Sequence, residues 1–75
     1  MTKLPRVSGG ECVAALGRAG FVFKRQEGSH IILRRNDRFA QVVVPNHREL
    51  DRGTLRSIIR DAGLTIEQFD ALLKR

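Results

Sequence analysis

The chain has 75 residues, of which 41% are hydrophobic and 29% charged, and its formal net charge is +6. This apolar content excludes a disordered chain, which combines few apolar residues with a high net charge. No apolar run approaches the roughly 18 residues of a membrane span, and a single cysteine excludes an internal disulfide. We therefore expect one cytoplasmic domain over residues 1–75, monomeric when alone. Its excess of lysine and arginine favours an anionic partner: RNA, DNA, an acidic protein or a membrane surface.

The first predicted element is a helix over residues 9–19, preceded by an extended arm at residues 1–7. Ser8 and Glu11 have the spacing of a capping box, in which each side chain bonds to the other residue's backbone. Apolar residues recur at helical spacing after them, at Cys12, Val13, Leu16 and Ala19. Gly20 ends the helix, because glycine readily adopts the left-handed conformation found just past a helix end.

Three strands are predicted next, at residues 21–26, 30–34 and 39–44, separated by turns at residues 27–29 and 36–37. Alternating apolar and polar residues and β-branched runs favour strands, and short turns favour an antiparallel meander. One face should be apolar and the other basic, since three cations in these strands cannot all be buried: Lys24, Arg34 and Arg35.

Two helices are predicted to complete the chain after a loop at residues 45–50. Asp51 is a good N-cap for the first, which Gly63 ends, and Thr65 with Gln68 forms a second capping box for a short last helix. The predicted core includes Leu16, Phe21, Phe23, Ile58, Ile59 and Phe69, and all four phenylalanines are assigned to it. Packing the helices on one face of the sheet gives an α+β fold that resembles a double-stranded RNA-binding domain.

His30 is the candidate catalytic residue, because it follows the turn Gly28–Ser29 and opens a strand. An imidazole titrates near pH 6.5, so it can take and return a proton at neutral pH, which RNA cleavage requires. Ser29 places a hydroxyl beside it. Alternatively, His30 is an ordinary strand residue, and His47 either contacts phosphate or holds its own loop. His30 and His47 are too far apart in sequence for a zinc motif, so we expect no metal or cofactor, and Cys12 on an apolar helix face should be inert.

Basic residues form two predicted RNA-binding groups. Arg52, Arg56 and Arg60 are spaced by four and make one helix stripe. The second group lies in the sheet and its turns and includes Lys24, Arg25 and Arg34. The alternative is an ordinary solvated face. Because no phenylalanine is left for the surface, recognition should depend on phosphates rather than on base stacking.

The sequence resembles the HicA-type toxins, small mRNA interferases of toxin–antitoxin pairs. The resemblance covers nearly the whole chain. It is carried by five stretches: Leu4-Pro5-Arg6-Val7-Ser8-Gly9, Ala19-Gly20-Phe21, Arg25-Gln26-Glu27-Gly28-Ser29-His30, Val44-Pro45-Asn46-His47-Arg48-Glu49-Leu50 and Gly53-Thr54-Leu55-Arg56-Ser57-Ile58-Ile59-Arg60-Asp61-Ala62-Gly63-Leu64. It implies a double-stranded RNA-binding-like fold, a metal-independent endoribonuclease that cleaves mRNA, a catalytic histidine at His30, and a HicB-like antitoxin that forms a hetero-oligomer with the toxin. Two other functions remain open: a non-catalytic RNA-binding module on the same fold and a small DNA-binding regulator.

Overall fold

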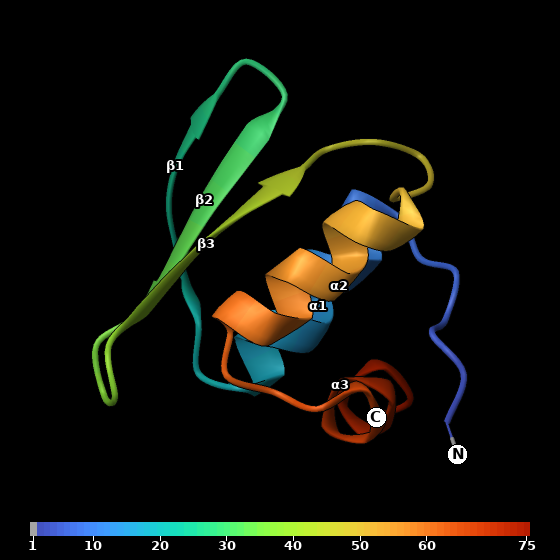
Figure 1. The fold of residues 1–75 in the computed structure, drawn as a ribbon. Helices are drawn as coiled ribbons and strands as arrows, with labels where there is room; N and C mark the ends of the chain where they lie inside the picture. Colours follow the sequence, from blue (N-terminus) through green and yellow to red (C-terminus); the bar gives the residue numbers. More distant parts are fainter. Residues whose placement is uncertain (1) are drawn as a thin grey trace.

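The computed structural model describes residues 2–75 and contains three helices and one three-stranded sheet. In chain order these are α1 (Gly9–Arg18), β1 (Val22–Glu27), β2 (His30–Arg35), β3 (Ala40–Pro45), α2 (Arg52–Asp61) and α3 (Ile66–Leu73). Figure 1 shows α1 and α2 on one face of the sheet and α3 beyond them, near the N-terminal arm. The α+β fold, the order of its elements and the helical layer are as the sequence predicts.

All three helices begin at the predicted N-cap residues, and at α1 and α3 the capping boxes are formed. The Ser8 hydroxyl accepts from Glu11 N at 3.0 Å, and Glu11 Oε1 accepts from Ser8 N at 2.9 Å. Thr65 and Gln68 form the same pair of bonds. Asp51 occupies the N-cap position of α2, as predicted, but its side chain makes no capping hydrogen bond. Its carboxylate lies beside Gly53, near the positive end of the helix dipole but without a directed bond.

The strands pair antiparallel in the order β1-β2-β3, and their register separates two faces. Ile31 lies opposite Val44 and Leu33 opposite Val42, and these four buried residues face the helices. His30, Ile32 and Arg34 alternate with them and therefore lie on the outer face. The pairing of β1 with β2 shifts between Phe23 and Arg25, where Lys24 is the extra residue of a β-bulge.

Two phenylalanines predicted to lie in the core are exposed. Phe23 shares the inner side of the sheet with its partner Leu33, yet its exposed fraction is 56%. The reason is that α1 and α2 pack over β3, so that β1 extends beyond the helical layer at the far edge of the sheet. Phe39 lies in the β2–β3 turn and is 70% exposed. The prediction of a sheet without an aromatic surface is therefore also wrong.

One hydrophobic core joins the sheet to all three helices. The predicted core residues other than Phe23 and Phe39 are buried: Leu16, Phe21, Ile58, Ile59 and Phe69. Within the predicted arm at residues 1–7, residues 2–7 form no helix or strand and contribute the buried side chains of Leu4 and Val7, while residue 1 lies outside the described residues. Leu50 N donates to Val7 O at 2.8 Å and so ties the arm to the loop before α2. Within residues 2–75, no helix is long and apolar enough to cross a membrane.

Candidate functional site

The β1–β2 turn holds the candidate catalytic residues at one end of the sheet. Gly28 has a φ of 60°, a conformation that glycine adopts without steric cost, and its carbonyl accepts from Gln26 Nε2 at 3.0 Å. Ser29 and His30 follow directly and are both exposed. Ser29 O accepts from Asn46 N at 2.6 Å, so the turn is attached to the loop that follows β3. The imidazole of His30 is therefore presented to solvent from a tethered backbone.

The loop carrying His47 is fixed in turn against the first residue of α1. Gly9 N donates to His47 O at 2.8 Å, and His47 N donates to Pro45 O at 2.9 Å. Gly9 is buried, and a Cβ atom there would overlap Pro45 O, so only glycine allows this approach. Turn, loop and helix start thus form one hydrogen-bonded unit, which Figure 1 shows at the end of the sheet where β3 leaves toward α2. His47 is exposed and lies two residues after Pro45, the register partner of His30.

The immediate cross-strand neighbour of His30 is an acidic residue that the sequence did not single out. Glu27 lies opposite His30 in the register of β1 and β2. Its carboxylate accepts from Arg25 Nε at 2.6 Å, in an ion pair whose two side chains are more than half exposed. Such a pair adds little stability, so Arg25 remains available to an incoming phosphate.

The predicted cations in the sheet occupy different surroundings. Arg34 lies on the outer face, where Nε and Nη2 both donate to Gln41 Oε1 at 3.0 and 2.9 Å. Lys24 is exposed at the bulge. Arg35 instead points to the helical side, where its guanidinium lies 4.8 Å from the ring centroid of Phe21 and Nη2 donates to Ala62 O.

The predicted arginine stripe of α2 is present and exposed. Arg52, Arg56 and Arg60 follow one side of the helix and border two shallow grooves toward the arm and α3. Arg60 has a 3.6 Å contact with Asp61, both largely exposed. Because α2 covers the inner face of the sheet, this stripe is separated from Arg25 and Arg34 on the outer face. The structure thus divides the predicted cations into two groups.

Cys12 has the surroundings of a structural residue. Its side chain is buried, and burial raises the pKa of its thiol from 9.0 to about 12. The reactive thiolate is therefore scarce at neutral pH. Across residues 2–75, His, Cys, Asp and Glu side chains do not gather in threes in a way that would hold a metal ion.

One surface, at the β2–β3 turn, was not predicted from the sequence. Phe39 is exposed there, with Arg34 Cζ 6.0 Å from its ring centroid. Arg38 precedes it with a φ of 56°, the only residue other than glycine with positive φ among those described. The exposure of Phe39 could have been inferred from its position directly after the polar turn Asn36-Asp37-Arg38, where no strand alternation requires burial.

The fold and its surface define a class: a small basic α+β domain with a helix-backed sheet, two groups of arginines on its surface and an exposed histidine on a tethered turn. The family described as HicA toxin of bacterial toxin–antitoxin matches residues 9–64, which is most of the chain. The chain belongs to this family. It is thus a toxin of a toxin–antitoxin pair, and the family implies an antitoxin partner. No curated protein matches the chain.

Proposed function

We propose that the protein is an endoribonuclease that cleaves mRNA in the cytoplasm and so arrests translation and growth. Residues 1–75 act as a single domain without metal or cofactor. A HicB-like antitoxin neutralises it by forming a hetero-oligomer with an otherwise monomeric toxin. Membership of the HicA toxin family supports the toxin role, and the surface around His30 supports the chemistry.

The observation that carries the proposal is the exposure of His30 on a turn whose backbone is held from two sides. The turn is braced by Asn46 N on Ser29 O and by the pairing of His30 with both neighbouring strands. A general acid or base must be held within hydrogen-bond reach of the proton that it transfers. An exposed imidazole on a fixed backbone meets this requirement for a substrate as large as RNA.

The proposed reaction transfers one phosphoryl group within the RNA strand. A base removes the proton of a 2′-hydroxyl, and the 2′-oxygen attacks the adjacent phosphorus. The bond between phosphorus and the 5′-oxygen then breaks, and an acid protonates the leaving oxygen, which gives a 2′,3′-cyclic phosphate and a 5′-hydroxyl. His30 is the general base or acid, and Ser29 orients it or the phosphate. His47, on the loop attached to this turn, is a candidate secondary group.

Cations are needed because negative charge develops on the phosphate oxygens in the transition state. Arg25 lies on the same outer face as His30, opposite Ile32 in the register. Lys24 and Arg34 extend this positive charge along the sheet. Arg52, Arg56 and Arg60 bind more distant phosphates.

The test is His30→Ala, which we expect to abolish growth arrest on induction and to slow RNA cleavage about 10²- to 10⁴-fold, the usual contribution of general acid–base catalysis. RNA binding should persist, because the lysine and arginine contacts to phosphate are retained. Cleavage is followed on labelled RNA by gel electrophoresis, with circular dichroism as the check on folding.

His47→Ala is the matched control, for which we expect a smaller loss, and chelator should leave parent activity unchanged. If His30→Ala cleaved RNA like the parent, the catalytic assignment would be wrong. If the parent bound RNA without cleaving it, the chain would be a non-catalytic RNA-binding module. Neutralisation is tested by adding the antitoxin encoded beside the gene, which should abolish cleavage and elute with the toxin as one complex.

A further inference from the structure

A hollow of about 370 Å³ lies between the end of α1, the β2–β3 turn and α3, and four arginines line it: Arg18, Arg35, Arg38 and Arg75. The other residues that line this hollow are neutral. We call it the arginine hollow. It lies at the end of the sheet away from His30, since β2 runs from His30 to Arg35, about 17 Å at roughly 3.3 Å per residue.

Two of these arginines are held by backbone carbonyls rather than by carboxylates. Arg18 Nη1 donates to Leu72 O at 2.9 Å. Arg35 donates from Nε to Arg38 O and from Nη2 to Ala62 O, both at 3.3 Å, while stacking on Phe21. These bonds fix the guanidinium groups without neutralising them, so the hollow keeps an excess of positive charge. A phosphate group is the ligand that such a cluster suits best.

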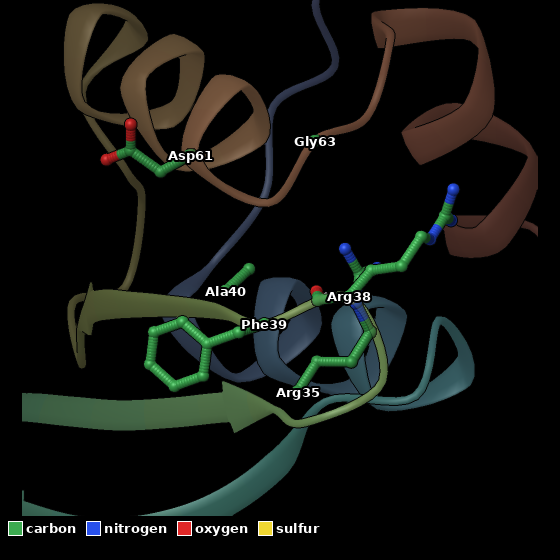
Figure 2. Close-up of a pocket in the computed structure, with 6 residues that line it drawn as sticks. All are labelled: Arg35, Arg38, Phe39, Ala40, Asp61 and Gly63. Atoms are coloured by element: carbon green, nitrogen blue, oxygen red, sulfur yellow. Dashed lines mark hydrogen bonds between the residues drawn. The ribbon is translucent and has the colours of Figure 1, made fainter.

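An exposed aromatic ring adjoins the arginine hollow. Phe39 lines a second pocket of about 370 Å³, which shares Arg35 and Arg38 with the hollow. Figure 2 shows the ring of Phe39 beside the strands, while the side chain of Arg38 extends the other way, toward α3. The guanidinium of Arg34 lies 6.0 Å from the ring centroid, and the ring remains 70% exposed.

We propose that this end of the molecule is a second RNA-contact site, in which a backbone phosphate binds in the arginine hollow and a neighbouring base stacks on Phe39. The inference depends on the proposed function for the identity of the ligand. An acidic protein would also satisfy the arginines. RNA is the better fit, because each of its nucleotides offers both a base and a phosphate. The neighbouring residues Phe39 and Arg38 offer a ring for the base and a guanidinium for the phosphate. A base on an aromatic ring contributes binding without sequence preference, since every base has a π face.

The first experiment uses Phe39→Trp as a reporter, because the chain contains neither tryptophan nor tyrosine. The probe is a single-stranded 2′-O-methyl RNA on the order of ten nucleotides long, within the site sizes of single-strand binders. It keeps phosphates and bases but lacks the 2′-hydroxyl required for cleavage. Stacking should quench the indole fluorescence in a saturable way. Phe23→Trp, at the other exposed phenylalanine, should show little quenching.

The second experiment measures the affinity of variants for the same RNA. Phe39→Ala should weaken binding about 5- to 150-fold, the range for removal of one stacked base, whereas Phe23→Ala should change it little. Arg38→Gln should make the negative slope of log affinity against log salt shallower by about 0.7. This is the change expected when one cation fewer contacts the phosphates of a single-stranded RNA. Arg6→Gln, an exposed arginine on the arm, should leave the slope nearly unchanged.

Quenching at Phe39→Trp together with weaker binding confined to the Phe39 and Arg38 variants would support the site. If the parent binds and cleaves RNA while these variants bind like the parent, the second site is wrong and the proposed function stands. If the parent neither binds nor cleaves RNA, both are wrong. If the variants lose binding to the antitoxin but bind RNA like the parent, the surface belongs to the protein partner and the inference is overturned.

Discussion

Gly9 couples the folding of the first helix to the position of the candidate catalytic turn. Its missing side chain lets Pro45 O approach the start of α1, and its amide bonds to His47 O. The preceding residue of this loop, Asn46, bonds to the carbonyl of Ser29. A change at Gly9 is therefore transmitted through one short loop to the residue before His30.

We predict that Gly9→Ala destabilises the protein by about 1–3 kcal/mol, the usual cost of overpacking, and lowers RNA cleavage beyond what the unfolded fraction explains. Urea denaturation gives the free energy of unfolding, and cleavage is assayed well below the transition. Gly17→Ala is the control. It lies in the exposed interior of the same helix with nothing within 4 Å, so it should stabilise by up to about 1 kcal/mol. Equal effects of the two substitutions would contradict this role of Gly9.

Some residue roles are visible in sequence and others are not. The capping box of Ser8 and Glu11 is local, with both partners three residues apart, so the spacing alone predicted it. The packing of Gly9 against Pro45 joins distant parts of the chain, so no local sequence pattern reveals it. The same holds for Arg18, whose guanidinium meets Leu72 O across 54 residues.

Among the elements, α2 presents a row of like charges. Its arginine stripe is exposed, as the four-residue spacing predicted. Three like charges along one side of a helix repel one another, and Asp61 offsets only Arg60 at 3.6 Å. An anionic ligand would relieve this repulsion.

Replacing Arg52, Arg56 and Arg60 together with glutamine should flatten the salt dependence of RNA binding. The negative slope of log affinity against log salt should become shallower by about 0.7 for each arginine that binds a phosphate, and by roughly 2 if all three do so. Filter binding at several salt concentrations, without antitoxin, gives the slope. Lys74→Gln, whose lysine is paired with Asp70 at 2.9 Å, is the control. An unchanged slope in the triple variant would mean that the stripe is only a solvated face.

Phe23 was wrongly predicted because strand patterns carry no information about which part of a sheet is covered. Alternation along a strand tells which side of the sheet a residue faces, but it does not tell whether a helix covers that side. Phe23 faces the same side as Leu33, yet the helices stop short of β1. Their lateral position depends on long-range packing of α1 and α2 against β3, which no short window of sequence contains.

At the scale of the whole molecule, a single core makes Cys12 a reporter of global unfolding. The side chain is fully buried, with an exposed fraction of 0%, and its neighbours come from a cluster shared by sheet and helices. We predict that iodoacetamide labels it very slowly at neutral pH and rapidly in urea, in proportion to the unfolded fraction, as mass spectrometry would measure. Rapid labelling of the native protein would contradict this burial.

The raised pKa of Cys12 also sets a pH dependence. The folded thiol stays protonated up to about pH 12, whereas the unfolded thiol loses its proton near 9.0. The unfolded state therefore binds fewer protons between these values, and stability falls as the pH rises through this range. Cys12→Ala should be less stable overall because of its cavity, but its stability, measured by urea denaturation at several pH values, should fall less steeply above pH 9.

The bulge at Lys24 interrupts the free edge of β1. Without the bulge, the unpaired edge of β1 would present a straight row of amide and carbonyl groups. A strand of another molecule can pair with such a row. The shift between Phe23 and Arg25 interrupts that row, and the charges of Lys24, Arg25 and Glu27 crowd what remains. Such irregular, charged edges resist edge-to-edge aggregation.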